Sequence, residues 1–257
     1  MTLQTHWTAI CATYTPIQIE LTGSLLVMLL TFYIPSTIFI SLPYLFPDWS
    51  RRHQHQPPSK QPSGKDIFRA FTTCVRNNAL TASLQALNFY LGGHSSLRIT
   101  PTLPSLYEIL WQFVFGLLFR EVAFYLVHRA LHHPLLYGPL HKKHHEFTAP
   151  IAFSAQHATF TEQVVANTLP ILLPYAIIKA HIVSFWIFVG WELIQTVIDH
   201  SGFETGFWQG KSHDRHHEVF RGHYGTLGIM DWVCGTDEEG MRRRRIKGRE
   251  PKEGKEL

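Results

Sequence analysis

Nine of the 17 histidines stand in three short clusters whose spacing is typical of metal ligands. The clusters read HxxxHH, HxxHH and HxxHH, and their histidines are His128, His132, His133, His141, His144, His145, His213, His216 and His217. Residues four apart lie on one face of a helix, so the outer histidines of each cluster can approach one ion. The chain has only three cysteines, which favours an oxygen-handling metal over a thiolate-bound structural zinc.

The number of imidazoles predicts two metal ions, because one ion takes about three to six ligands. His200, in the sequence Asp-His-Ser-Gly, is a further candidate ligand. In the first cluster both His132 and His133 stay candidates, since Pro134 can end the helix at that point. Two weaker candidates are His157 and His223. Three carboxylates near the clusters are expected to orient ligand imidazoles through hydrogen bonds: Glu121, Glu146 and Asp199.

Long apolar segments predict the elements that must carry these clusters. Residues 21–46 contain no charged residue and exceed the roughly 20 residues that span a bilayer. Residues 106–127 are strongly apolar and lead into the first cluster. Residues 164–198 are long enough for two crossings and carry a polar break at 179–181. Residues 67–91 favour a helix that is only half apolar. We predict an all-α integral membrane helical bundle.

The clusters can share metals only if they lie on one side of the membrane. Residues 164–198, which separate the second and third clusters, must then cross twice, as a hairpin. Arg51, Arg52 and Lys60 follow the first apolar segment, and the positive-inside bias places them in the cytoplasm. Residues 67–91 must cross back before 106–127 returns. All the clusters, forming a histidine-rich di-metal site, are therefore expected at the cytosolic face.

The chain divides into three predicted parts. Residues 1–105 are membrane anchor helices and a connector, 106–237 a catalytic domain, and 238–257 a basic tail expected to be disordered. Arg120 and Glu121 interrupt an apolar helix and are expected to face a polar interior at the metal site. The net charge of +4 comes with no nucleic-acid-binding motif, so nucleic acid is not an expected partner.

The motifs together resemble the fatty acid hydroxylase/sterol desaturase superfamily of endoplasmic-reticulum membrane oxygenases. They are REVAFYLVHRALHHPLLY (120–137), HKKHHEFTAP (141–150), DHSG (199–202) and HDRHH (213–217). The ending YGTLGIMDWVCGTD (224–237) is most similar to the sterol C4-methyl oxidase-like branch. Two departures stand out: Thr159 occupies a position where relatives often carry histidine, and His223 one where they often carry asparagine.

The resemblance implies the cofactors and partners. The clustered histidines, with His200, would bind two iron ions, which zinc could replace in a purified sample. The oxidant would be O2, and electrons would come from NAD(P)H through a cytochrome b5-type donor. The absence of a GxGxxG or haem motif agrees with an external electron source.

The resemblance also implies a monooxygenase in the endoplasmic reticulum membrane that oxidises a C–H bond, expected to be a methyl group of a sterol or triterpenoid. A fatty-acyl or sphingoid hydroxylase or desaturase of the same superfamily is an alternative. A non-catalytic membrane metal-binding protein is a second alternative, although all three clusters are intact.

Overall fold

The computed structural model describes residues 2–204 and 210–247, and these form helices without a strand. The long helices are α2 (Pro16–Met28), which continues into α3 (Ile34–Leu45), α5 (Gly64–Tyr90), α6 (Leu106–Leu131), α9 (Leu169–Ile177) and α10 (Ile182–Asp199). The shorter helices are α1 (Leu3–Thr13), α4 (Pro47–His53), α7 (Pro134–Leu136), α8 (Phe160–Glu162), α11 (Gly210–Val219), α12 (Ile229–Cys234) and α13 (Glu238–Lys247). The predicted all-α bundle is confirmed.

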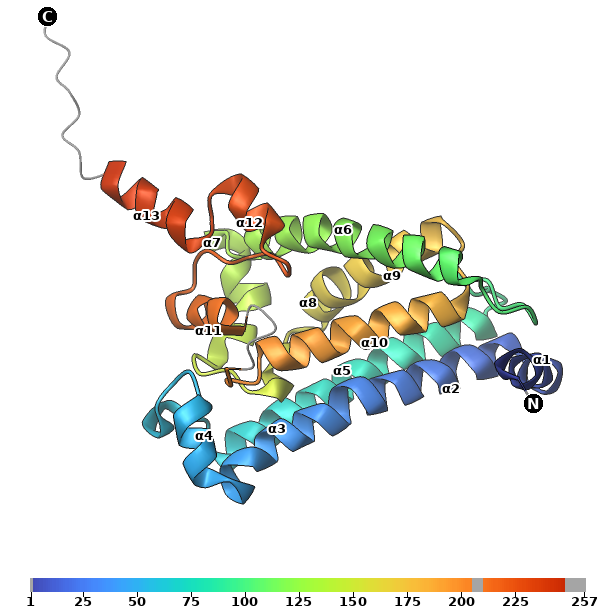
Figure 1. Ribbon diagram of the computed structural model, residues 1–257, viewed down its shortest axis with the longest axis horizontal. Coiled ribbons are helices and arrows are strands. Elements are labelled where there is room, and N and C mark those ends of the chain that lie inside the picture. Colours follow the sequence, from blue (N-terminus) through green and yellow to red (C-terminus); the bar gives the residue numbers. More distant parts are fainter. Residues whose placement is uncertain (1, 205–209, 248–257) are drawn as a thin grey trace, which may run out of the picture.

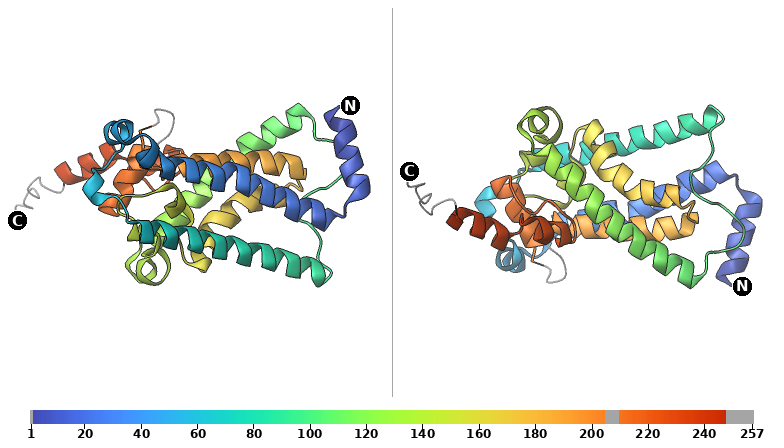
Figure 2. Two further views of the ribbon diagram at one scale, coloured as in Figure 1. Left: turned by 90° about the horizontal axis from the view of Figure 1, so that it is seen from below. Right: turned by 90° about the horizontal axis from the view of Figure 1, so that it is seen from above.

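The long helices run side by side in alternating directions (Figures 1 and 2). The α2–α3 helix runs from the end covered by α1 toward the end that holds α4, and α5 returns. Helix α6 again runs toward the α4 end, α8 and α9 return, and α10 comes back a third time. Helices α7, α11 and α12 gather at the end that α3, α6 and α10 reach. The expected hairpin therefore returns the chain to the end where the first cluster lies.

Prolines and wide helical turns shape two of these helices. A π-helical turn at Leu29–Tyr33 joins α2 to α3 just before Pro35. A second one, at Gln163–Thr168, joins α8 to α9 just before Pro170. Proline cannot donate the usual backbone hydrogen bond, and a π turn relieves the clash of its ring with the preceding turn. The break in the hairpin falls at Lys179, whose φ is +49°.

Three helices are long and apolar enough to cross a membrane: Pro16–Leu45, Leu106–Leu131 and Ile182–Asp199. Their outward side chains are large and apolar, for example Leu25, Leu30 and Leu118, each more than half exposed. Such a surface would be unfavourable in water and fits a lipid environment. Helix α5 is more polar; a capping box of Ser63 and Asp66 begins it.

The C-terminal tail differs from the expectation. Residues 238–247, expected to be disordered, form helix α13. Glu239 pairs with Arg242 and Arg243, three and four residues later, which stabilises a helix. The remaining tail residues, 248–257, lie outside the described part of the chain.

Candidate metal centre

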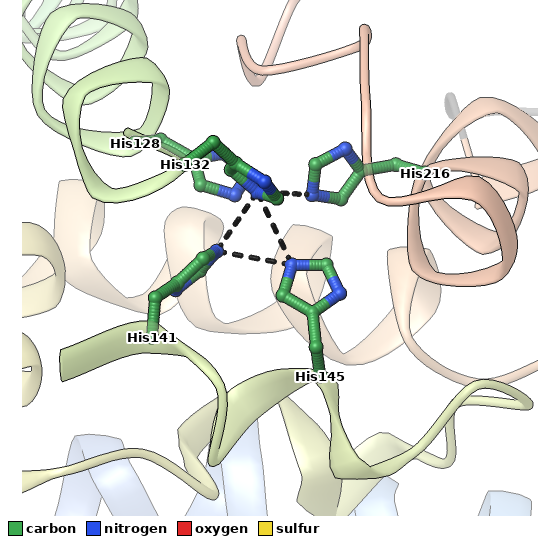
Figure 3. Close-up of side chains that lie close together, drawn as sticks. All are labelled: His128, His132, His141, His145 and His216. Carbon is green, nitrogen blue, oxygen red and sulfur yellow. Dashed lines mark hydrogen bonds between the residues drawn. The ribbon is translucent and has the colours of Figure 1, made fainter. Parts of the chain in front are cut away.

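Nine histidines converge into two groups at the end of the bundle where α6 and α10 finish. The five-histidine group consists of His128, His132, His141, His145 and His216 (Figure 3). The four-histidine group consists of His144, His200, His213 and His217. In each group the candidate ligand atoms all lie within 4.8 Å of one another. The two groups are neighbours, since the ring centroids of His145 and His217 are 4.7 Å apart.

Local helix geometry divides the adjacent histidines between the groups. His128 and His132 project from the last turn of α6 onto one face. In the pairs His144–His145 and His216–His217, one member joins each group. Successive side chains on a helical turn point about 100° apart, because a turn holds about 3.6 residues. A doublet of histidines therefore serves two ions, which explains the repeated HxxHH spacing.

The Nδ1 atoms of several rings are held by acceptors. His128 Nδ1 donates to the Tyr224 carbonyl at 2.9 Å, and His216 Nδ1 donates to the Gly222 carbonyl at 2.6 Å. His141 Nδ1 donates to the Glu162 carboxylate at 2.6 Å. In the four-histidine group, His200 donates to the Thr196 carbonyl and His217 to the Phe147 carbonyl. A neutral ring with a proton on Nδ1 presents a lone pair at Nε2.

These lone pairs point at one another. His132 Nε2 lies 3.0 Å from His141 Nε2, 3.2 Å from His145 Nε2 and 3.1 Å from His216 Nε2 (dashed lines, Figure 3). His128 Nε2 is buried and has no hydrogen-bond partner among the described residues. Converging lone pairs repel one another unless a cation lies between them. The donor set therefore fits a metal ion better than it fits a hydrogen-bond network.

Burial keeps these rings neutral. It lowers the pKa of His132 to about 3, with a further contribution from His128, and the pKa of His200 to about 4. The pKa values of His144, His213 and His217 also fall well below the ordinary range, chiefly through burial. Neutral imidazole is the form that binds metal, so the site is set for coordination at physiological pH.

Three predicted histidines lie outside both groups. His133 is exposed and caps α7 through a hydrogen bond from Leu135. The geometry thus selects His132 of the two candidates. His157 is buried, but it pairs with Glu146 at 3.0 Å. His223 is half-buried, with a φ of +53°.

Among the described residues, none of the three predicted carboxylates forms a hydrogen bond with a grouped histidine. Glu146 holds His157 and Arg69. Asp199 is half-buried within electrostatic range of Arg120, and Arg120 itself pairs with Glu192. Glu121 accepts the backbone N–H groups of Thr226, Leu227 and Met230, so it holds the loop whose Tyr224 carbonyl binds His128. Its support of the metal site is therefore indirect.

The carboxylate that contacts a grouped histidine, Glu162, was missed by sequence reasoning. Thr159 positions it: the Thr159 hydroxyl caps α8 by accepting from the Glu162 N–H and donates to the Leu140 carbonyl. A threonine followed three residues later by glutamate is a helix-start signal, and it was readable in the sequence. The departure at Thr159 thus has a structural role.

A cavity of about 460 Å³ lies among the helices of the bundle. Its wall is formed by α2 and α5 on one side and by α6, α9 and α10 on the other, with apolar side chains such as Met28, Ile171 and Trp186. It reaches Thr196, which binds His200, and Gln163, next to Glu162. The cavity is therefore lined by the residue that holds His200 and by the chain neighbour of the residue that holds His141.

Residues 113–236 match the family model of the fatty acid hydroxylases, and this range contains all nine grouped histidines. The chain therefore contains a region similar to the fatty acid hydroxylases. It is 33% identical over 195 residues to the fatty acid hydroxylase ahd1 of Mycosarcoma maydis, covering 75% of this chain and 51% of that protein. It is 39% identical over 136 residues to fatty acid hydroxylase domain-containing protein 2 of Homo sapiens, covering 52% and 41%.

A sterol enzyme matches over a longer range. Methylsterol monooxygenase 1 of Gallus gallus is 28% identical over 249 residues, covering 91% of this chain and 81% of that protein. The chain spans about half the length of ahd1 and less of the human relative. No solved structure matches this chain.

Proposed function

We propose that the protein is a membrane-bound non-haem di-iron monooxygenase that oxidises a C–H bond of a lipid. The convergence of nine imidazoles into two adjacent groups, together with a cavity of about 460 Å³ within the same bundle, carries this proposal. The relatives named for hydroxylase and monooxygenase activity support it. Membrane lipids reach such a cavity directly when the surrounding helices span the bilayer.

The two groups would each hold one iron ion. The donors are nitrogen only, with no thiolate, which suits an iron that reacts with oxygen better than a structural zinc. When bound, the two irons would supply activation of O2 and removal of hydrogen from the substrate. The chain's own residues fix the Nδ1 protons of the ligands, shape the cavity, and exclude water from the reacting carbon.

A sterol or triterpenoid is the proposed substrate, oxidised at a methyl group. The long match to the methylsterol monooxygenase of Gallus gallus favours it. Electrons from NAD(P)H would arrive through cytochrome b5 at the cytosolic face of the endoplasmic reticulum. The basic helix α13, at the same end as the histidines, offers a positively charged surface near this face.

A fatty-acyl or sphingoid hydroxylase or desaturase is the second candidate. The match to the fatty acid hydroxylase of Mycosarcoma maydis favours it. A non-catalytic metal-binding protein is a third, and it would need no cavity beside the ions.

Expression in membranes that contain a cytochrome b5 reductase system, followed by lipid profiling, tests the function. We expect new oxygenated lipids with the wild-type chain and none with the double variant His144→Ala, His216→Ala, which removes one ligand from each group. His133→Ala is the matched control and keeps the activity, because that ring is exposed. Identical profiles for the wild type and the double variant would refute the oxygenase proposal.

A further inference from the structure

A buried ion pair lines the cavity. Arg120 on α6 and Glu192 on α10 meet with Nε and Oε2 2.8 Å apart, and their side chains are only 8% and 2% exposed. Both residues belong to the cavity wall. Charges inside an apolar, membrane-type bundle are costly, and a well-packed apolar pair often stabilises such a position better. The cost points to a function for the pair.

Arg120 has a buried N–H donor that forms no hydrogen bond with the described residues. A guanidinium carries five N–H groups, and its strongest partner here, Glu192, lies beside Nε. One face of the guanidinium lies over the Phe124 ring, 5.1 Å from the centroid. Nη1 is buried and has no hydrogen-bond partner among the described residues. A buried donor without an acceptor destabilises the protein, so an acceptor oxygen entering the cavity would be bound strongly.

The charges around the pair determine whether a carboxylate or a hydroxyl oxygen can bind there. Arg120 and Glu192 together are neutral, and Asp199, two turns further along α10, lies within electrostatic range of Arg120. A lipid carboxylate would meet these two acidic side chains and be repelled. A hydroxyl accepts from Arg120 and donates to Glu192 at the same time.

We propose that Arg120 and Glu192 form the subsite that binds the hydroxyl group of a neutral lipid alcohol. The proposed binding of the alcohol depends only on the residues of the cavity. The oxidation of the bound lipid rests on the proposed function. This subsite makes both residues positioning residues for the substrate.

The subsite also limits which carbon is oxidised. Arg120 precedes His128 by two turns of α6, and Glu192 precedes His200 by two turns of α10. Eight residues of helix rise about 12 Å. A lipid held at the hydroxyl then presents to the histidines a carbon within about this distance of it, while the far end of a longer chain lies beyond their reach.

Binding of a fluorescent sterol tests the subsite. The probes are dehydroergosterol, which has a free hydroxyl, and its methyl ether. The signal is energy transfer from tryptophan to the bound sterol, and Trp186 lies in the cavity wall. We expect the wild type, in detergent, to bind the alcohol about ten-fold more tightly than the ether, since a satisfied buried hydrogen bond is worth about one such factor. The double variant Arg120→Met, Glu192→Met removes both charges together and should bind the two probes equally.

Matched controls separate the subsite from general damage. Glu108→Gln alters another ion pair of α6, with Arg98, outside the cavity, and it should keep the ten-fold preference. Glu192→Gln removes one negative charge. It should lower the concentration of octadecanoic acid that displaces the sterol by about ten-fold, and unfolding cannot produce such a gain in binding.

Three results would overturn the proposal: equal binding of alcohol and ether by the wild type, an alcohol preference retained in the double variant, or a wild type that binds octadecanoic acid more tightly than octadecanol. The assay contains a chelator and no electron donor. A protein that shows the predicted binding but oxidises no lipid would therefore contradict the proposed function and leave the subsite in place.

Discussion

Glu162 accepts the Nδ1–H of His141 across 2.6 Å, and both side chains are almost fully buried. The hydrogen bond fixes the proton on Nδ1 and directs the Nε2 lone pair of His141 into the five-histidine group. A carboxylate in this position also makes the imidazole a stronger donor to a metal.

Loss of this carboxylate should weaken metal binding. We expect Glu162→Ala to lower iron affinity by about 10- to 100-fold, and Glu162→Gln to have a smaller effect because its amide oxygen still accepts. Iron retained per protein after dialysis against a graded chelator series measures the change. Glu146→Gln is the control, since Glu146 holds His157 and neither group. Equal retention in Glu162→Ala and Glu146→Gln would contradict the prediction.

The two candidate histidines at the end of α6 should behave differently. His132→Ala removes a nitrogen from the centre of the five-histidine group and should halve the bound iron and abolish lipid oxidation. His133→Ala removes an exposed ring and should change neither. Iron content and lipid profiles of the two variants, expressed in parallel, decide between them. A loss of iron in His133→Ala would contradict the exposed position of His133 after the end of α6.

Glu121 should matter for stability more than for chemistry. Its buried carboxylate accepts three backbone N–H groups and the Thr226 hydroxyl, from the loop before α12 and the first turn of α12. We expect Glu121→Gln to lower the free energy of unfolding by about 1–3 kcal/mol, because an amide cannot accept all four. Thermal unfolding of the purified protein measures this. The exposed Glu239→Gln should shift the midpoint far less.

The metal-free protein should lose stability as the pH falls. His200 and His132 take a proton in the folded state only near pH 4 and pH 3, since burial lowers each pKa, whereas an unfolded histidine takes one near 6.5. Between these values the unfolded state binds more protons, so acid favours unfolding. The midpoint of thermal unfolding of chelator-treated protein should fall steadily from pH 7 to pH 4. A flat profile over this range would show that the rings are not buried as described.

The sequence predicted the helices and most members of the two histidine groups because both depend on local spacing. Residues four apart share a helix face in any fold, so the pairing of His128 with His132 was readable at once. The return of the hairpin 164–198 followed from the need to bring two clusters together. The choice between His132 and His133 depended on where α6 ends, which the position of Pro134 alone did not settle.

The contacts that were missed join residues far apart in the chain. Glu192 lies in a segment whose sequence is otherwise apolar and predicts a membrane span. Its ion pair with Arg120 depends on how α6 and α10 pack together, which the sequence does not show. Glu121 and Asp199 stand next to the clusters in sequence, yet their side chains point to other partners. Nearness along the chain predicted neither carboxylate correctly, because a helix sends neighbouring side chains to different faces.

The grouped histidines all come from residues 128–217, while α2 and α5 form one wall of the cavity and carry none of them. The chain thus separates the grouped histidines from part of the cavity wall that would contact the proposed lipid. Changes in the first 90 residues could alter that wall, and with it the substrate preference, while the grouped histidines stay untouched. For protein engineering, the N-terminal helices are an exchangeable part, and chimaeras that swap residues 1–90 between superfamily members should retain their iron while accepting different lipids.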